Sequence, residues 1–353
     1  MSRTASRAGS PARQAATGAS WSSRPSVRIA LLAALAGVLV VVCVASLFIG
    51  SGDISLSAAL GALQHGGTDT TAILVNQFRV PRMYLGLLVG AALAIAGALM
   101  QAVTRNPLAD PGILGVNAGA YFAVVLAVAF TGATNVSSYI GWAFAGAGVT
   151  TLVVYLIGTR GRSGATPVLL VLAGVAVGAV LGGIGRGITL LNPDVFDKIR
   201  FWNAGSLQGR QIDTVTGVLP FIVVGLILAL TLPRALNAVA LGDDVAVALG
   251  AHIARTRILA IVAVTSLCGA ATAAAGPILF LGLLVPYIAR SIVGPDQRWI
   301  FPFALVLGPI VFLSADVLGR LLVDAELPVG IVTAFIGAPV LIALMRRRKV
   351  AEL

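Results

Sequence analysis

Ten long, mostly apolar stretches run through this 353-residue chain, and few charged side chains interrupt them. Only 10% of the residues are charged, against about 25% in an average soluble domain. A helix needs roughly 20 apolar residues to cross the hydrocarbon core of a bilayer. The pattern predicts an all-α polytopic membrane protein with about ten transmembrane helices. We expect these helices at residues 29–50, 80–104, 112–131, 139–158, 167–190, 213–233, 256–275, 277–293, 300–319 and 329–345.

Basic residues gather at both ends of the chain and predict its topology. Ten spans place both termini on one side, and the positive-inside rule makes that side the cytoplasm. We expect a disordered basic cytoplasmic tail at 1–28, a ten-helix transmembrane domain at 29–348 and a cytoplasmic tail at 349–353. The net charge of +11 is then a topology signal rather than a sign of nucleic-acid binding. The first stretch is longer than the roughly 7–15 residues of a secretory signal, so we interpret it as an uncleaved span.

The sequence contains few of the residues that a nucleotide-binding, metal-binding or catalytic site would need. The only lysines are Lys198 and Lys349, and neither follows a glycine-rich phosphate loop, so we expect no ATP site of that kind. Two cysteines and two histidines are too scattered for a metal centre, and no nucleophile–base set favours an enzyme. Ion-coupled transport would place acidic groups within spans; Asp316 and Asp110 keep that class open as an alternative.

Glycines recur every four residues in the fifth stretch, at Gly174, Gly178 and Gly182. This spacing puts them on one helix face, where small residues let two helix backbones approach closely. One interpretation is a packing seam. The other is a smooth face that lines a transport pathway.

Several motifs, in a fixed order, resemble one family. The family is FecCD, the permease subunits of bacterial importers for iron–siderophores, haem and vitamin B12, and the resemblance extends from about residue 29 to 348. The matching motifs include Arg79-Val-Pro-Arg82, Thr104-Arg-Asn-Pro-Leu-Ala-Asp-Pro-Gly-Ile-Leu-Gly115, Trp202-Asn-Ala-Gly-Ser-Leu207, Gly276-Pro-Ile-Leu-Phe-Leu-Gly-Leu-Leu-Val-Pro286 and Glu326-Leu-Pro-Val-Gly330.

The resemblance implies the fold of a type II ABC importer permease and a set of partners. A second permease subunit, identical or paralogous, would complete the pore within the membrane lipid. Two ATP-binding subunits would attach inside and bind ATP and Mg, so this chain would need no cofactor. A substrate-binding protein would dock outside. Ferric siderophore is the expected substrate, with haem or cobalamin as alternatives.

The resemblance also implies roles for three arginines that we expect just outside the spans. In the family, arginines matching Arg79, Arg82 and Arg320 meet glutamates of the binding protein. Opposite charges of this kind steer docking and fix its register. The alternative role is to anchor a helix end among lipid headgroups.

The internal segment 234–255 matches the part of the family that couples to the ATPase. We expect it to hold two short helices, one of which would lie in a groove of an ATP-binding subunit. The alternative is an ordinary amphipathic connector. The coupling candidates are Leu241, Gly242, Val245, Ala246, Leu249 and Gly250.

Prolines mark two places that could shape the inner part of the pathway. Asn106-Pro107 and Asp110-Pro111 interrupt the chain between the second and third spans, and Thr166-Pro167 opens the fifth, where the resemblance implies a gate. Irregular backbone is tolerated at membrane depth where protein or water covers it.

Overall fold

The computed structural model describes residues 24–50, 56–65, 69–133, 136–159, 167–323 and 325–347, and every regular element in these ranges is a helix. The elements are α1 (Pro25–Phe48), α2 (Leu56–His65), α3 (Thr70–Ile73), the π-helix η2 (Leu74–Arg79), α4 (Val80–Thr104), the 3-10 helix η3 (Pro111–Leu114), α5 (Val116–Thr131), α6 (Val136–Thr159), α7 (Pro167–Leu191), α8 (Pro193–Asn203), α9 (Ile212–Leu230), α10 (Pro233–Ala240), α11 (Asp243–Ala248), α12 (Ile253–Ala275), α13 (Leu281–Val293), α14 (Gln297–Leu322) and α15 (Val329–Arg347).

The ten predicted spans each coincide with one helix, and the all-α polytopic fold is confirmed. Seven helical segments in the described ranges are long and apolar enough to cross a membrane. The other three expected positions carry shorter apolar helices at Val116–Thr131, Leu281–Val293 and Val329–Ala343. The first helix begins at Pro25, four residues before the predicted start. The rest of the expected tails, 1–23 and 348–353, lies outside the described residues.

The second span begins earlier than the sequence predicts. Helix continues without a break from Thr70 to Thr104, whereas a polar connection was expected as far as residue 79. Within this run η2 has the wider π geometry, which takes up an extra residue. Arg79 therefore lies within a continuous helix and is buried, whereas the sequence predicted that the helix begins after it. Arg320 is likewise buried within α14.

Helix α4 forms the centre of the bundle. In its most apolar stretch 78% of the residues are buried, against 6% for α1 at the periphery. Close approach to its neighbours depends on glycine, because small residues let membrane helices pack backbone to backbone. A Cβ added at Gly308 of α14 would lie 2.3 Å from the carbonyl oxygen of Gly90, and one added at Gly97 would lie 1.7 Å from that of Gly282 in α13.

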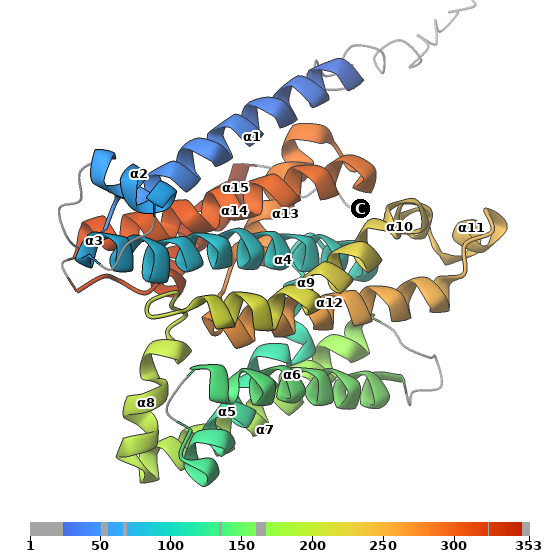
Figure 1. The fold of residues 1–353 in the computed structure, drawn as a ribbon. Coiled ribbons are helices and arrows are strands. Elements are labelled where there is room, and N and C mark those ends of the chain that lie inside the picture. The colour runs from blue at the N-terminus through green and yellow to red at the C-terminus, as the bar shows by residue number, and fades with distance from the viewer. Residues whose placement is uncertain are drawn as a thin grey trace, which may run out of the picture.

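The long helices run roughly side by side, so the bundle has two ends (Figure 1). Helices α3 and α8 lie at the left-hand end in Figure 1, which we call the α3 end. Helices α10 and α11 lie at the opposite end, with α11 outermost, and we call this the α11 end. Both ends carry charged side chains that join helices far apart in the sequence.

Candidate functional site: two ionic clusters

Three arginines and two carboxylates come together at the α3 end and form what we call the α3-end cluster: Arg79, Arg82, Arg320, Asp316 and Glu326. Asp316 is at its centre and is only 1% exposed. Its Oδ1 accepts a 2.8 Å bond from Nη2 of Arg82, and its Oδ2 accepts bonds from Nε and Nη2 of Arg320. Arg82 also donates from Nη1 to Oε2 of Glu326 at 2.7 Å.

Two arginines of this cluster also hold the end of α1. Nη1 of Arg79 donates to the carbonyl oxygens of Leu47 and Phe48, at 2.9 and 3.0 Å. Nη1 of Arg320 donates to those of Ser46 and Ile49, at 2.8 and 2.7 Å. The last carbonyl groups of a helix lack partners within it and carry partial negative charge, so cations suit this position.

A cavity of about 260 Å³ opens among these arginines. The structure thus brings Arg79, Arg82 and Arg320 together, as the docking hypothesis requires. It also gives them partners that sequence reasoning missed, namely the α1 carbonyl groups and Glu326. Glu326 has a left-handed backbone with φ of +53°. The cavity is lined by Gly50, Leu74, Phe78, Arg79, Arg82, Gln208, Gly209, Arg320 and Glu326.

The predicted coupling segment forms two short helices, α10 and α11, at the α11 end. Gly242 separates them and Gly250 follows α11, both with positive φ, at +110° and +81°. Among the side chains of α11, Ala246 alone is buried. The apolar side chains of Leu241, Val245 and Leu249 are exposed by 64%, 45% and 64%. The segment therefore presents an apolar surface outward.

A second ionic cluster fixes the first turn of α11, and we call it the α11 triad: Arg105, Asp243 and Arg257. Arg105 follows the last residue of α4, and its Nη2 donates to Oδ1 of Asp243. Arg257, in the second turn of α12, donates from Nη2 to Oδ2 at 3.0 Å. Desolvation alone would raise the pKa of Asp243, but the charge of Arg257 and the hydrogen bonds and charge of Arg105 outweigh it, so the pKa is lowered.

The residues between α4 and α5 act as turn caps. The Oδ1 atom of Asn106 accepts the Leu108 N–H at 2.9 Å, and that of Asp110 accepts the Gly112 N–H at 2.8 Å. Pro107 lies in the first turn, and Pro111 begins η3. These contacts give the segment a fixed irregular shape directly after Arg105. Of the proposed gate, Thr166 lies outside the described residues, and Pro167 begins α7.

The three α7 glycines that recur every four residues differ in their surroundings. The carbonyl oxygen of Gly174 lies 3.8 Å from a Cβ added at Gly115, and a Cβ added at Gly178 would lie 3.6 Å from that of Ala118. A Cβ added at Gly182 would have no neighbour within 4 Å. The first half of the glycine face therefore packs, while its second half has open space beside it.

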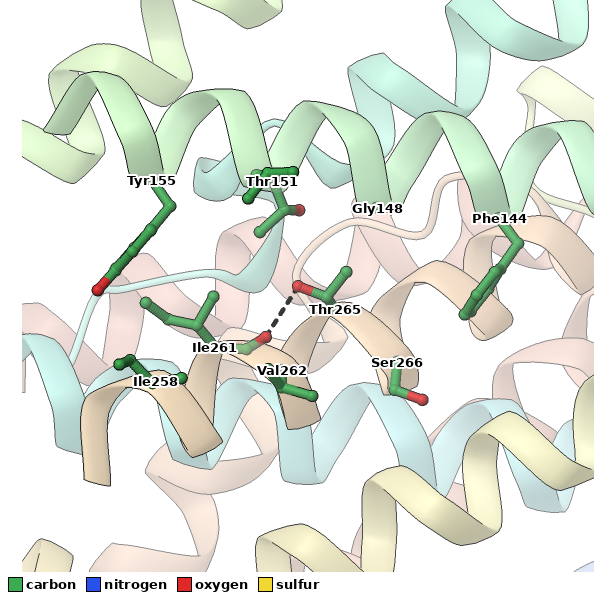
Figure 2. A pocket seen from close by; sticks show the side chains of 10 residues that line it. Phe144, Gly148, Thr151, Tyr155, Ile258, Ile261, Val262, Thr265 and Ser266 are labelled. Atoms are coloured by element: carbon green, nitrogen blue, oxygen red, sulfur yellow. Dashed lines mark hydrogen bonds between the residues drawn. The ribbon is translucent and has the colours of Figure 1, made fainter. Parts of the chain in front are cut away.

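A groove of about 450 Å³ lies between α6 and α12. Phe144 and Tyr155 project into it from α6, and the Thr265 hydroxyl is bonded to the Ile261 carbonyl oxygen on the α12 side (Figure 2). Its lining residues carry no charge, so it offers nothing to bind an ionic ligand. In the described part of the chain, no group of three or more His, Cys, Asp or Glu side chains could hold a metal ion.

Comparison with known proteins identifies the family. The model of the FecCD transport family matches residues 38–347. The ferric enterobactin transport system permease protein FepD of Escherichia coli (strain K12) is 48% identical over 326 residues, which cover 92% of this chain and 98% of that protein. The cobalamin import system permease protein BtuC of Halobacterium salinarum is 37% identical over 292 residues, or 82% of this chain and 78% of that protein.

A solved structure shows the same fold. It is described as an inward-facing conformation of a metal-chelate type ABC transporter, and it is 28% identical in sequence. The superposition has a TM-score of 0.81 and covers 91% of this chain and 100% of the other. The chain belongs to the FecCD transport family.

Proposed function

We propose that this chain is the permease subunit of an ATP-driven importer for ferric siderophores, and that it forms the translocation pathway together with a second permease subunit. The observation that carries the proposal is the 48% identity to a ferric enterobactin permease over 98% of that protein's length. Cobalamin and haem are the alternative substrates. The more distant cobalamin import permease, at 37% identity, supports cobalamin as an alternative.

Charge supports one orientation in the membrane. The α1 helix starts at the α11 end, directly after an Arg-rich sequence, and most of the 24 basic residues fall at that end or in the tails. Under the positive-inside rule the α11 end then faces the cytoplasm. The α3-end cluster faces outward, where a substrate-binding protein would arrive.

The α3-end cluster is our proposed docking site for that binding protein. Arg82 has a side chain 12% exposed and borders the cavity together with Arg79 and Arg320. A carboxylate on the binding protein could enter the cavity and take over part of the contact that Glu326 makes with Arg82. Such an exchange would fix the register of docking and steer the approach.

The segment from Leu241 to Gly250 is our proposed contact with the ATP-binding subunits, which would bind ATP and Mg. An amphipathic helix that lays its apolar face in a groove is a common mode of recognition, and the exposed Leu241, Val245 and Leu249 supply such a face. Substrate would pass along the open part of the α7 glycine face and past the 106–111 turns, with a gate at Thr166-Pro167.

Uptake of ⁵⁵Fe-enterobactin tests the proposal. In cells that lack this gene we expect uptake to be lost, to return with the native gene, and to require the ATP-binding subunits. Competition with unlabelled ferric citrate, haem and cobalamin ranks the alternative substrates. Uptake that persists without the ATP-binding subunits and collapses with the ion gradient would instead establish a secondary transporter.

A further inference from the structure

The α11 triad is placed where a moving part meets the bundle. Helix α11 is the outermost element at its end (Figure 1), and Ala246 is its only buried side chain. Its apolar side chains face outward, where they cannot fasten it to the rest of the chain. The ionic contacts of Asp243, at the first residue of α11, are therefore its main attachment to helices other than its neighbour α10.

The attachment reaches α12, which follows α11 in the chain, and α4, which lies far from it in the sequence. Arg105 caps α4, the most buried of the long helices, and leads directly into the Asn106–Pro111 turns. Arg257 belongs to α12, and 67% of the residues in the most apolar stretch of that helix are buried. By contrast, α10 is fastened to the start of α14, because Asn237 bonds to Asp296 and to the Gln297 N–H. The two short helices are thus held by different polar contacts, although α10 also packs against α4 and α12.

The triad also has unused bonding capacity. The Nε atoms of Arg105 and Arg257 are both buried and have no hydrogen-bond partner among the described residues. Asp243 could shift between the donors of the two arginines without losing its ionic contacts. An ATP-binding subunit that covered α11 would exclude water and strengthen these contacts.

We infer that Asp243 is a positioning residue for energy coupling: it ties α11 to α4 and α12 through Arg105 and Arg257, so that movement of α11 is passed to the pathway. This inference rests on the importer function proposed above. It separates two roles in one segment, because the exposed apolar face would bind the ATPase while Asp243 transmits the movement.

The test compares transport with hydrolysis in the reconstituted importer, with its own ATP-binding subunits and binding protein, and with ⁵⁵Fe-enterobactin as the probe. For Asp243→Asn we expect ATP hydrolysis to continue while iron imported per ATP falls about fivefold or more, the lower range for coupling between two sites. Asp244→Asn is the matched control, since Asp244 makes no ion pair with any described residue, and it should behave as native. Transport and hydrolysis that fall together, or an unchanged ratio, would overturn the inference.

A second pair of variants tests whether a loss of coupling only reflects failure of this chain to assemble with the ATP-binding subunits. Arg105→Gln removes only the link to α4, and Arg255→Gln changes an exposed arginine in the first turn of α12. Arg105→Gln should lower the ratio of transport to hydrolysis, and Arg255→Gln should not. If Asp243→Asn and Arg105→Gln both fail to assemble with the ATP-binding subunits, the triad serves assembly and the inference is wrong.

A substrate-independent measurement separates this inference from the proposed function. Spin labels at Val247 of α11 and Ile258 of α12, which are 62% and 46% exposed, report the distance across the triad. In the native chain that distance should stay constant when the importer binds ATP, and in Asp243→Asn its distribution should broaden. If native importer fails to carry ⁵⁵Fe-enterobactin but the labels behave as described, the substrate is wrong and the inference holds. Equal distributions in both chains would refute the inference alone.

Discussion

The two ionic clusters use the same chemistry in opposite settings. At the α3 end, Asp316 and Arg320 have side chains 1% and 2% exposed, and the Arg320 guanidinium also donates to carbonyl oxygens at the end of α1. At the α11 end, Asp243 is 45% exposed and Arg105 33%. Buried charges are costly to separate, whereas exposed ones are screened by water. The difference indicates that the α3-end cluster contributes strongly to the stability of the bundle, while the α11 triad joins α11 to α4 and α12 with little effect on stability.

The backbone packing shows the same contrast. Helices α4 and α14, which carry most of the α3-end cluster, meet at Gly90 and Gly308 with no room for another carbon atom. Helix α11 has a single buried side chain. A rigid half and a movable half follow from these contacts, and four measurements test the division.

The largest effect is expected for Asp316→Asn. The change removes the charge that Arg82 and Arg320 share, and it leaves Arg82 with Glu326 alone and the buried Arg320 without its ionic partner. Breaking a buried pair in this way costs about 3–5 kcal/mol of unfolding free energy. We expect a strongly lowered Tm of the purified protein in detergent and a low yield in the membrane.

The matched control for that variant is Asp197→Asn, which breaks an exposed pair on α8. Asp197 and Arg200 are 63% and 51% exposed, and such pairs contribute about 0–1 kcal/mol. The Tm should therefore stay close to the native value. Equal losses in both variants would contradict the structural role of the buried cluster.

A smaller loss is expected for Gly308→Ala. The new methyl group would lie 2.3 Å from the Gly90 carbonyl oxygen and 2.7 Å from the Cβ of Ala94, and backbone must shift to admit it. Overpacking of this kind costs about 1–3 kcal/mol. Thermal unfolding in detergent measures the loss, and Gly217→Ala is the control, because a Cβ there has no neighbour within 4 Å. A native-like Tm for Gly308→Ala would mean that α4 and α14 can separate easily.

A binding measurement tests the one part of the α3-end cluster that we expect to exchange partners. Glu326→Gln removes the internal carboxylate from Arg82, so the binding protein should dock about twofold to fivefold more tightly, the range for a partly exposed charge pair. Arg82→Gln should weaken docking. Surface plasmon resonance on the importer in nanodiscs measures both. Unchanged affinity in the two variants would leave these residues a purely structural role.

The positions of the helices could be predicted from sequence because hydrophobicity is a local property. Each apolar stretch within a bilayer must satisfy its own backbone hydrogen bonds and therefore favours a helix whatever its neighbours are. The early start at Thr70 could not, since its polar side chains bond to distant parts of the chain: Asn76 donates to the Ala62 carbonyl oxygen, and Arg79 donates to carbonyl oxygens at the end of α1. The charge patterns at the two ends gave candidate residues but not their partners.

Most of the missed partners are separated too far in the chain for a local pattern to reveal, although Asp316 and Arg320 lie four residues apart on α14 and could have been paired from their spacing. Asp316 pairs with Arg82 across 234 positions, and Asp243 with Arg105 across 138. From sequence, Asp316 was the acidic residue that kept ion-coupled transport open. In the structure both of its oxygens are engaged by arginines, which accounts for an acidic group in a span without ion coupling. Gly86 and Gly90 of α4 share the four-residue spacing of the α7 glycines, but the spacing does not say that Gly308 of α14 packs against Gly90.

The smallest effect is expected for the stability of Asp243→Asn, and it completes the contrast with Asp316→Asn. Because Asp243 is 45% exposed, the loss should be about 0–1 kcal/mol. Because the pKa of Asp243 is lowered in the folded protein, its ionised carboxylate contributes to the free energy of unfolding at pH values above the ordinary aspartate pKa of about 3.9. This contribution is lost only at lower pH. The Tm difference between native and variant should therefore stay small and constant from about pH 5 to pH 8.

Thermal unfolding of the two proteins across that pH range makes the comparison direct. A small, pH-independent difference in Tm, together with a lowered ratio of transport to hydrolysis, would indicate that the triad serves coupling rather than folding stability. A loss as large as that of Asp316→Asn would show instead that α11 is part of the rigid half, and the division between the two ends would fail. The stability of this one variant thus decides whether the two clusters differ in role or only in exposure.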